Sequence, residues 1–398
     1  MGRIVLTGRG RRRVHGGHPW IYRDDIAAGE GEPGELVPVE ATDGGPLGWG
    51  LYSTASKIAV RLVTRSAEQP ERAFWLARVT RAVEARRRLG YLASDGACRL
   101  LGGDADLLPG LVVDRYAGVL VVQSGCQGSD RMRDFLLGLL DVALGAPAEH
   151  VLERSDAGVR KLEELPPRVG WLRGGVAQML EVKERIGGAH ELVYEVDVLE
   201  GHKTGHYLDQ RENRLRAAAR AAAGEGRVLD AFCYDGLFGI RAALAGAREV
   251  LCIDQSAAAG ERLMRNAERN GVHDRVRFER ANAMNDLRAR AQAGERYGLA
   301  IVDPPAFARN RREAEGAARG YRELNLRALA LLSEGGVLVT CSCSYNVRAA
   351  DFLAYLAEAS RDAGVPAWVV ETAGAAPDHP ALLALPESHY LKCVVLAT

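Results

Sequence analysis

The carboxyl-terminal half of the chain alternates short apolar runs with longer amphipathic stretches. Between the runs, apolar residues recur at the spacing of a helix face, which predicts helices over residues 237–245, 257–270, 283–291, 313–332 and 349–363. The apolar runs themselves predict seven strands, at residues 227–230, 249–253, 275–278, 299–302, 336–340, 367–370 and 390–396. Alternation of this length indicates an α/β domain with a parallel, doubly wound, Rossmann-like sheet of seven strands.

The amino-terminal half has a different rhythm. Residues 1–68 are short β-rich segments broken by glycine, proline and Asp-Gly-Gly, which predicts a small β-barrel. A helical pattern follows over residues 71–89, and then segments typical of a hairpin, a helix and further strands. We therefore expect three domains: a barrel at 1–68, an α+β domain at 72–198, and the α/β domain at 199–398.

Residues at the carboxyl ends of the first three predicted strands indicate a nucleotide-type ligand, because doubly wound sheets bind ligands at that edge. Gly236 and Gly239 follow the first strand and permit close backbone approach, although a structural tight turn explains them almost as well. Asp254 ends the second strand, where an acid holds ribose hydroxyls; the alternative is a helix cap. Asn282 follows the third strand and either reads an adenine edge or caps the next helix.

The fourth and fifth strands end in the sharper signals. Asp303 precedes two prolines that fix the backbone, and Phe307 is available to stack on a base. Cys341 and Cys343 point to the same side if the fifth strand continues that far, and lie near Asp303 if the two strands are neighbours. Three interpretations of the cysteines remain: buried small side chains, half of a metal site, or a nucleophile. A metal site would need further ligands, and no His or Cys cluster lies nearby in the sequence.

Charge and cysteine content bear on the partner and on the cellular compartment. The formal net charge is zero, yet residues 1–23 hold six arginines and no acid, which indicates either a phosphate-binding arm or a solvated face. The seven cysteines lack disulfide-framework spacing and CxxC pairs. The start of the chain lacks a signal-peptide pattern, and the chain has no membrane-length apolar run, so we expect a reduced, cytoplasmic protein without a membrane partner.

Several blocks resemble one family over nearly the whole chain. They are RRVHGGHPWIY, DLLPGLVVDRY, ERSDAGVRKLE, GHKTGHYLDQRENR, FCYDGLFG, DPPAF, GYRELN, TCSCS and PESHYLK, in that order. Together they resemble the RlmI-type family of bacterial 23S rRNA cytosine-5 methyltransferases, which use S-adenosyl-L-methionine. The resemblance implies a PUA RNA-binding domain, an EEHEE-type middle domain and a class I methyltransferase domain, in agreement with the boundaries above.

The resemblance also implies roles for individual residues. Cys343 matches the catalytic nucleophile, whereas Cys341 falls where the family tolerates other residues, and Asp303 assists catalysis. Asp235 and Leu237 depart from the Thr and Gly usual in the first turn. The expected cofactor-binding residues are Phe232, Tyr234, Gly236, Asp254, Asn282, Asp303 and Gln210. The expected RNA-binding residues are Arg9, Arg11, Arg12, Arg13, Phe307 and Lys203.

Two other functions are compatible with the residues. Asp-Pro-Pro with an aromatic residue also suits methylation of a guanine ring nitrogen or exocyclic amine, which needs no cysteine. A non-catalytic rRNA-binding assembly factor with the same fold is the second alternative. In each case the expected partner is ribosomal RNA, free or partly assembled, and a homodimer is left open.

Overall fold

The computed structural model describes residues 2–186, 190–221, 226–307 and 314–398, and it forms two compact units. Unit 1 comprises Met1–Val182, Val196–Leu208 and Pro377–Ser388. Unit 2 comprises Lys183–Glu195, Asp209–Ala376 and His389–Thr398. The three-domain division at 1–68, 72–198 and 199–398 stays a prediction. Among the described residues, helices long and apolar enough to cross a membrane are absent.

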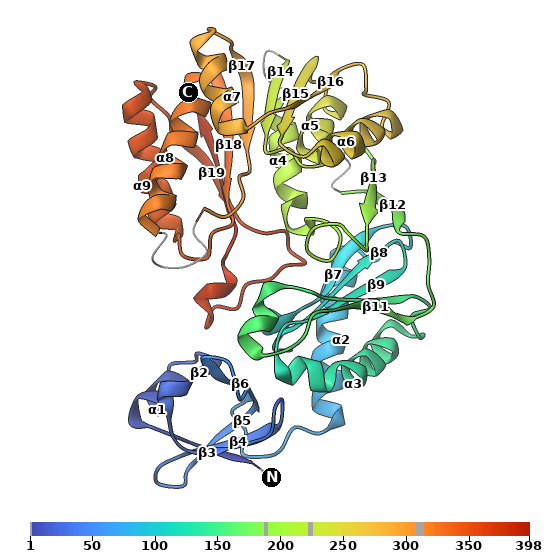
Figure 1. Cartoon of the computed structure of the whole chain (residues 1–398), viewed down its shortest axis with the longest axis vertical. Coiled ribbons are helices and arrows are strands. Elements are labelled where there is room, and N and C mark those ends of the chain that lie inside the picture. Colours follow the sequence, from blue (N-terminus) through green and yellow to red (C-terminus); the bar gives the residue numbers. More distant parts are fainter. Residues whose placement is uncertain (1, 187–189, 222–225, 308–313) are drawn as a thin grey trace. The chain divides into compact units, whose positions relative to one another are not determined.

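Unit 1 begins with a six-stranded sheet that curls around an apolar core (Figure 1). Burial alternates along β4, as expected of a strand with one face inward. The order of strands in the sheet is β2-β6-β5-β4-β1-β3. Their bounds are β1 Arg3–Leu6, β2 Trp20–Tyr22, β3 Ile26–Glu30, β4 Leu36–Ala41, β5 Pro46–Tyr52 and β6 Ile58–Thr64.

A helix within this sheet region was not predicted. The sequence was interpreted as strands throughout residues 1–68, but α1 spans Gly8–His15. The Thr7 hydroxyl accepts the Gly10 N–H at 3.1 Å and so caps the helix, and Val14 is buried. A Cβ at Gly10 would lie 2.6 Å from the Asp25 carbonyl oxygen, so glycine is required where this helix packs. One buried face on so short a helix leaves little periodicity to detect.

The second sheet of unit 1 has five strands in the order β11-β10-β9-β8-β7, with two long helices. The predicted hairpin is β8–β9, whereas β7 and β11 were not predicted. The bounds are α2 Arg72–Arg88, β7 Ala97–Gly102, β8 Leu111–Tyr116, β9 Val119–Ser124, α3 Gln127–Leu144, β10 Val151–Ser155 and β11 Arg168–Arg173. The segment predicted as a strand near residue 195 is β13 (Leu192–Asp197), paired with β12 (Met179–Glu184) in a separate sheet.

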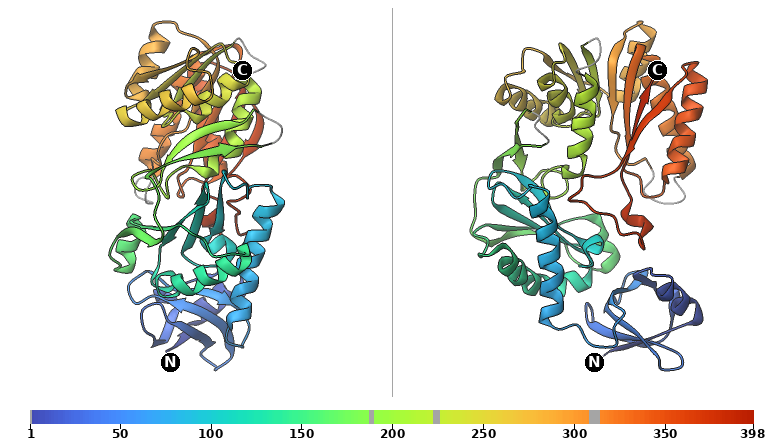
Figure 2. Two further views of the ribbon diagram at one scale, coloured as in Figure 1. Left: turned by 90° about the vertical axis from the view of Figure 1, so that its right-hand side faces the viewer. Right: turned by 180° about the vertical axis from the view of Figure 1, so that it is seen from behind.

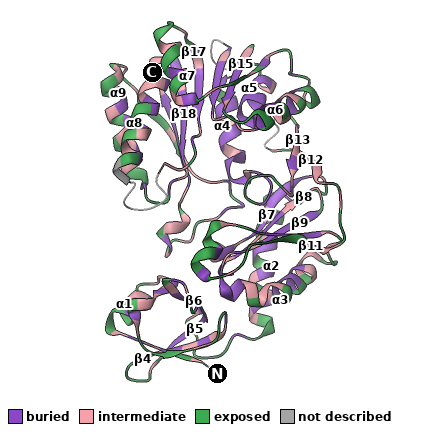
Figure 3. Cartoon of the chain, viewed as in Figure 1, coloured by how far each residue is buried: buried purple, intermediate pink, exposed green. Residues whose placement is uncertain are grey.

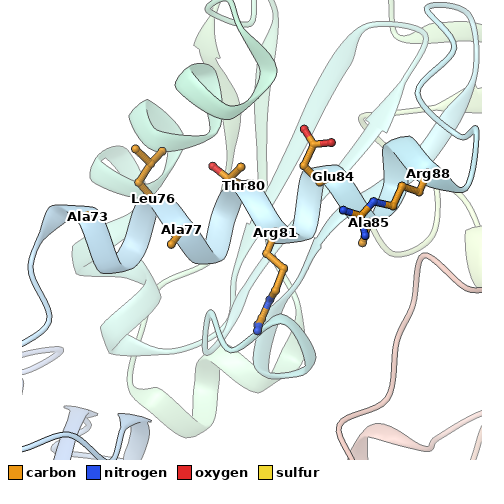
Figure 4. A pocket seen from close by; sticks show the side chains of 8 residues that line it. All are labelled: Ala73, Leu76, Ala77, Thr80, Arg81, Glu84, Ala85 and Arg88. Atoms are coloured by element: carbon orange, nitrogen blue, oxygen red, sulfur yellow. The ribbon is translucent and has the colours of Figure 1, made fainter.

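A shallow hollow follows one face of α2 (Figure 4). Its eight lining residues all come from this one helix and none is buried. Convergent polar groups from several elements are typical of a ligand site, and this hollow offers none.

Unit 2 is built on a seven-stranded sheet, and this number of strands was predicted. The order of strands is β16-β15-β14-β17-β18-β20-β19. Helices α7, α8 and α9 cover one face, and α4, α5 and α6 lie on the other (Figures 1 and 2). The strands between them are mostly buried (Figure 3). The strands are β14 Arg227–Ala231, β15 Glu249–Asp254, β16 Val276–Arg280, β17 Tyr297–Val302, β18 Leu332–Ser342, β19 Trp368–Ala373 and β20 Lys392–Ala397.

Five helices of unit 2, α5 to α9, follow the predicted pattern closely, whereas α4 was not predicted. The bounds are α4 Arg211–Ala221, α5 Leu237–Leu244, α6 Ala257–Arg269, α7 Ala283–Gln292, α8 Ala314–Ala330 and α9 Ala349–Ala363. The predicted start of the helix before α9, Glu313, lies outside the described residues. One prediction was wrong: the sheet is not wholly parallel, because β20 runs antiparallel to both of its neighbours, β18 and β19.

Candidate active site

The order of strands locates the ligand-binding edge of unit 2. From β14 the chain proceeds outward to β15 and β16, and then returns to β17 on the other side of β14. This reversal makes the β14/β17 pair the topological switch point, where the strand ends diverge and leave a crevice. The fourth and fifth strands are neighbours, because β17 pairs with β18 in parallel, so the condition for placing the cysteines near Asp303 is met.

The loop after β14 has an unusual backbone. Phe232, Tyr234 and Gly236 have φ angles of 62°, 51° and 79°, so three alternate residues occupy the left-handed region. Only glycine adopts this conformation without cost, and strained residues persist where the fold enforces them, commonly at ligand sites. The Tyr234 N–H donates to Asp254 Oδ2 at 3.0 Å, which ties this loop to the end of β15.

Asp254 and Asn282 both perform structural tasks at the strand ends. Asp254 Oδ1 also accepts the Ser256 N–H at 2.9 Å, while Ser256 itself caps α6. A carboxylate offers about four acceptor positions, so these two bonds do not exhaust Asp254. Asn282 caps α7, accepting the Asn285 N–H at 3.2 Å, which is the alternative considered for it. Their cofactor roles stay predictions.

A buried acid, Asp230, lies beneath this loop, and no role was predicted for its side chain from the sequence. It is 1% exposed, and its Oδ2 accepts the Gly239 N–H at 2.9 Å. Its Oδ1 has no hydrogen-bond partner among the described residues. Burial, together with the charges of nearby carboxylates, raises the pKa of Asp230 to about 8, so the side chain is mainly protonated at neutral pH.

Asp303 follows β17 and is held by Gln210. The Gln210 Nε2 donates to Asp303 Oδ2 at 2.9 Å. The Asn213 side chain donates to Gln210 Oε1 at 2.6 Å, which fixes the orientation of the Gln210 amide. Gln210 ends the 3-10 helix Leu208–Gln210 that precedes α4, so α4 and β17 jointly set the direction of the Asp303 carboxyl group.

The structure separates the two cysteines that the sequence left as alternatives. The strand β18 ends at Ser342, before Cys343, so strand geometry does not place the two cysteine side chains on the same side of the sheet. Cys341 is fully buried and lies opposite Cys393 on β20. The neighbouring Cys393 thiol and burial raise the pKa of Cys341 well above its usual value, which suits an inert thiol. Cys343 is half-buried, unlike the other six cysteines, and its Sγ lies 3.9 Å from the Pro304 carbonyl oxygen.

A hydroxyl network holds the backbone on both sides of Cys343. The Ser342 hydroxyl and the Ser344 hydroxyl each lie 2.9 Å from the hydroxyl of Tyr321, a buried residue of α8. Phe307 packs its ring against Tyr321 at 4.7 Å between centroids, so part of its surface is already used; stacking on a base stays a prediction. The block GYRELN, which contains Tyr321, gives no sequence signal for this role, because the contact depends on the packing of α8.

Lys392, the first residue of β20, was also missed. It is 7% exposed, and its ammonium group donates to the carbonyl oxygens of Ser344 at 2.7 Å and Tyr390 at 2.8 Å. Burial lowers the pKa of Lys392 to about 8, and the charge of Cys343 partly opposes that effect. The block PESHYLK contains this lysine. A parallel last strand, as predicted, would have placed Lys392 at the opposite edge of the sheet, away from the candidate site.

The predicted RNA-binding residues other than Phe307 belong to unit 1. Arg9 and Arg13 pair with the buried Asp25 at 2.6 and 2.9 Å, and Arg11 pairs with the exposed Asp43 at 2.9 Å. The arginine-rich segment is therefore a helix partly neutralised by acids that follow it in sequence. Lys203 is exposed and lies over the Tyr207 ring at 4.5 Å.

The residues at the switch point fit S-adenosylmethionine. Asp254 has a carboxylate that would accept ribose hydroxyls beside a loop of left-handed residues, and the half-buried Phe232 and Tyr234 would offer aromatic surface. Asp230 Oδ1 is a buried polar atom without a hydrogen-bond partner among the described residues, as expected where a polar ligand binds.

Comparisons with known proteins agree with this arrangement. A PUA-like domain model matches residues 4–65, and an S-adenosylmethionine-dependent methyltransferase model matches residues 132–389. The ribosomal RNA large subunit methyltransferase I of Shewanella amazonensis is 39% identical over 99% of this chain and 98% of its own. That of Aeromonas hydrophila is 38% identical over 95% of each chain.

Solved structures show the same fold. An S-adenosylmethionine-dependent methyltransferase from Streptococcus mutans has 17% identity and a TM-score of 0.83, with all of both chains covered. SMU.776, a methyltransferase complexed with SAH, has 18% identity and a TM-score of 0.85 over the same coverage. S-adenosylmethionine is thus the cofactor, and the chain belongs to the S-adenosylmethionine-dependent methyltransferases, in the family of the ribosomal RNA large subunit methyltransferase I proteins.

Proposed function

We propose that this protein methylates carbon 5 of a cytosine in 23S ribosomal RNA through a covalent bond to Cys343. The observation that carries the proposal is the contrast at the end of β18: Cys343 is the half-exposed cysteine beside the Asp-Pro-Pro turn, whereas Cys341 is fully buried. The rRNA substrate is supported by the names of relatives that cover nearly the whole chain, and by the PUA-like model.

The chemistry explains the need for a cysteine. Carbon 5 of cytosine is a poor nucleophile, and addition of the Cys343 thiolate to carbon 6 turns the ring into an enamine whose carbon 5 is reactive. S-adenosylmethionine supplies the methyl group. Removal of the carbon-5 proton by a base then expels Cys343 and restores the aromatic ring. Methylation of a guanine nitrogen would need none of these cysteine steps.

Asp303 serves the same adduct. In its protonated form it donates a hydrogen bond to ring nitrogen 3 of the cytosine and stabilises the ring as charge develops there. The Gln210 bond at 2.9 Å fixes the carboxyl group for this contact. We further assign cofactor contacts to Phe232, Tyr234, Gly236, Asp254, Asn282, Asp303 and Gln210.

RNA binding falls to unit 1 and Phe307 in this proposal. The target base must leave its stack, which costs a few kcal/mol. Phosphate contacts from Arg9, Arg11, Arg12, Arg13 and Lys203 offset that cost. The reaction would take place in the cytoplasm on free or partly assembled rRNA.

One experiment tests the covalent mechanism against its rivals. RNA carrying 5-fluorocytidine at the target should trap a covalent adduct, because fluorine prevents the proton removal that releases the enzyme. The trap and the formation of 5-methylcytosine, measured by nucleoside mass spectrometry, should vanish in Cys343→Ala.

The matched control is Cys341→Ala, which removes a buried thiol of the same strand end and should keep both signals. Full methylation by the double variant would refute the covalent mechanism. A different methylated base would identify guanine methylation, and no methylated base with intact cofactor binding would identify an assembly factor.

A further inference from the structure

Lys392 occupies an unusual electrostatic position. A buried lysine is costly unless a carboxylate or another anion compensates its charge. The polar contacts of its ammonium group with described residues are two neutral carbonyl oxygens, of Ser344 and Tyr390, and no salt bridge to a carboxylate is among them. Carbonyl groups orient the ammonium group but do not neutralise it.

The orientation of Lys392 is set by the sheet. In the antiparallel pair β18–β20, Lys392 lies directly opposite Ser342, the residue before Cys343. Its ammonium group bonds the carbonyl of Ser344, the residue after Cys343, at 2.7 Å. Lys392 therefore contacts the turn that carries the Cys343 thiol, at the carboxyl edge of the parallel strands.

Other titratable groups face this turn as well. Asp303 lies after β17, Tyr321 reaches in from α8 with its hydroxyl on both flanking serines, and Cys341 lies on β18 beside Cys393. Asp303 carries a negative charge when ionised and therefore disfavours a thiolate nearby. Lys392 is a cation bonded to the same turn, and its positive charge favours the thiolate. In turn, a negative charge on Cys343 raises the pKa of Lys392.

We propose that Lys392 is the counter-cation of Cys343, holding its thiol in the ionised form that attacks the base. The inference rests on the proposed role of Cys343 as nucleophile. Lys392 acts on the substrate only through Cys343 and is thus a positioning residue. An opposite charge within about 4–6 Å favours an ionised group, commonly by one to three pKa units.

The test measures the thiol directly and needs no RNA. Because Cys343 alone is half-exposed among the cysteines, iodoacetamide should label it first in the native protein. The rate of Cys343 labelling, followed by peptide mass spectrometry across pH, should have a midpoint about one unit or more higher in Lys392→Met. Lys392→Arg, which keeps the positive charge, should retain a midpoint close to that of the wild type. The control Lys161→Met, at an exposed lysine of unit 1, should change nothing.

A reciprocal measurement covers the case in which Lys392→Met does not fold, judged by S-adenosylmethionine calorimetry and circular dichroism. The chain has five lysines, so the Lys392 signal can be followed by NMR with labelled lysine. In Cys343→Ala, the titration midpoint of Lys392 should fall below that of the wild type.

The outcomes separate the two proposals. An unchanged labelling midpoint in Lys392→Met, or an unchanged Lys392 titration in Cys343→Ala, overturns the ion pair even if Cys343 proves to be the nucleophile. Methylation that persists in Cys343→Ala overturns the proposed function, while the labelling midpoint still decides whether the lysine and the thiolate interact.

Discussion

Replacing Asp230 with asparagine tests the electrostatics beneath the cofactor loop. The carboxyl group is buried, and its pKa is raised to about 8 from an ordinary 3.8, first by burial and then by the charges of Asp303, Asp254 and Asp235. The Gly239 N–H bond opposes this rise but does not cancel it. The folded protein therefore keeps a proton here that the unfolded chain has lost above about pH 4.

The sign of the effect follows from this difference in proton binding. Between about pH 4 and pH 8 the native state binds more protons than the unfolded state, so this group makes stability fall as pH rises. Each pKa unit corresponds to about 1.4 kcal/mol, and the cost at pH 7 is up to about 4 kcal/mol. Above pH 8 the dependence levels off, because both states are then ionised.

Asparagine imitates the protonated acid and cannot ionise. Its oxygen accepts the Gly239 N–H, and its amide group occupies the place of the protonated Oδ1. In urea unfolding between pH 5 and pH 8, Asp230→Asn should gain stability over the wild type at about 1 kcal/mol per pH unit. The control Asp274→Asn, at an exposed acid of the same unit, should show no such gain. Parallel pH profiles for Asp230→Asn and the wild type would mean that Asp230 is ionised in the native protein.

Three shorter predictions concern the other parts of the molecule. Asp254→Ala should weaken S-adenosylmethionine binding by more than about 1 kcal/mol in calorimetry, because a charged hydrogen bond is lost. Tyr321→Phe should lower unfolding free energy by about 1–3 kcal/mol and methylation more than cofactor affinity, because two serines lose their shared partner. Arg11→Gln with Arg12→Gln should lower RNA affinity and its salt dependence in filter binding while leaving the cofactor site unchanged.

The arginine experiment is restricted to two residues for a structural reason. The sequence suggests replacing all four arginines of the segment, but Arg9 and Arg13 neutralise Asp25, whose side chain is fully buried. Removing both would leave a buried unpaired carboxylate and unfold the sheet that carries the test. Sequence patterning cannot reveal this pairing, because Asp25 lies more than ten residues beyond the arginines.

The alternating domain was the most predictable part of the fold. Its inner strands, such as β14, β15 and β17, are buried on both faces and give apolar runs, whereas the edge strands β16 and β19 are mostly exposed. Its helices have one apolar face, so both patterns are strong. The helix α9 begins and ends at the predicted residues, 349 and 363. The helices α1 and α4 and the strands β7, β11 and β12 were missed. The short α1 and the partly exposed β11 leave weak periodicity, since β11 is exposed over its first half.

The candidate site was predictable where one residue carries a distinctive motif, and unpredictable where the partner is remote. The Asp-Pro-Pro turn and the two cysteines were evident, but the difference between Cys341 and Cys343 depends on where β18 ends and on Cys393 across the sheet. The role of Tyr321 depends on α8 packing beneath the turn. Such contacts join positions far apart in sequence, and the pattern of a single sequence does not reveal them.

The antiparallel direction of β20, which the sequence did not predict, is also what brings Lys392 to Cys343. In a parallel strand, the first residue lies at the edge opposite the carboxyl ends of its neighbours. Had β20 been parallel, Lys392 would lie away from the candidate site and Ala397 would lie at it. Because β20 is antiparallel, Lys392 pairs with Ser342 and Ala397 with Val337. The reversal thus brings a buried cation to the edge where Cys343 lies, and a wholly parallel sheet of the same sequence would leave that thiol without it.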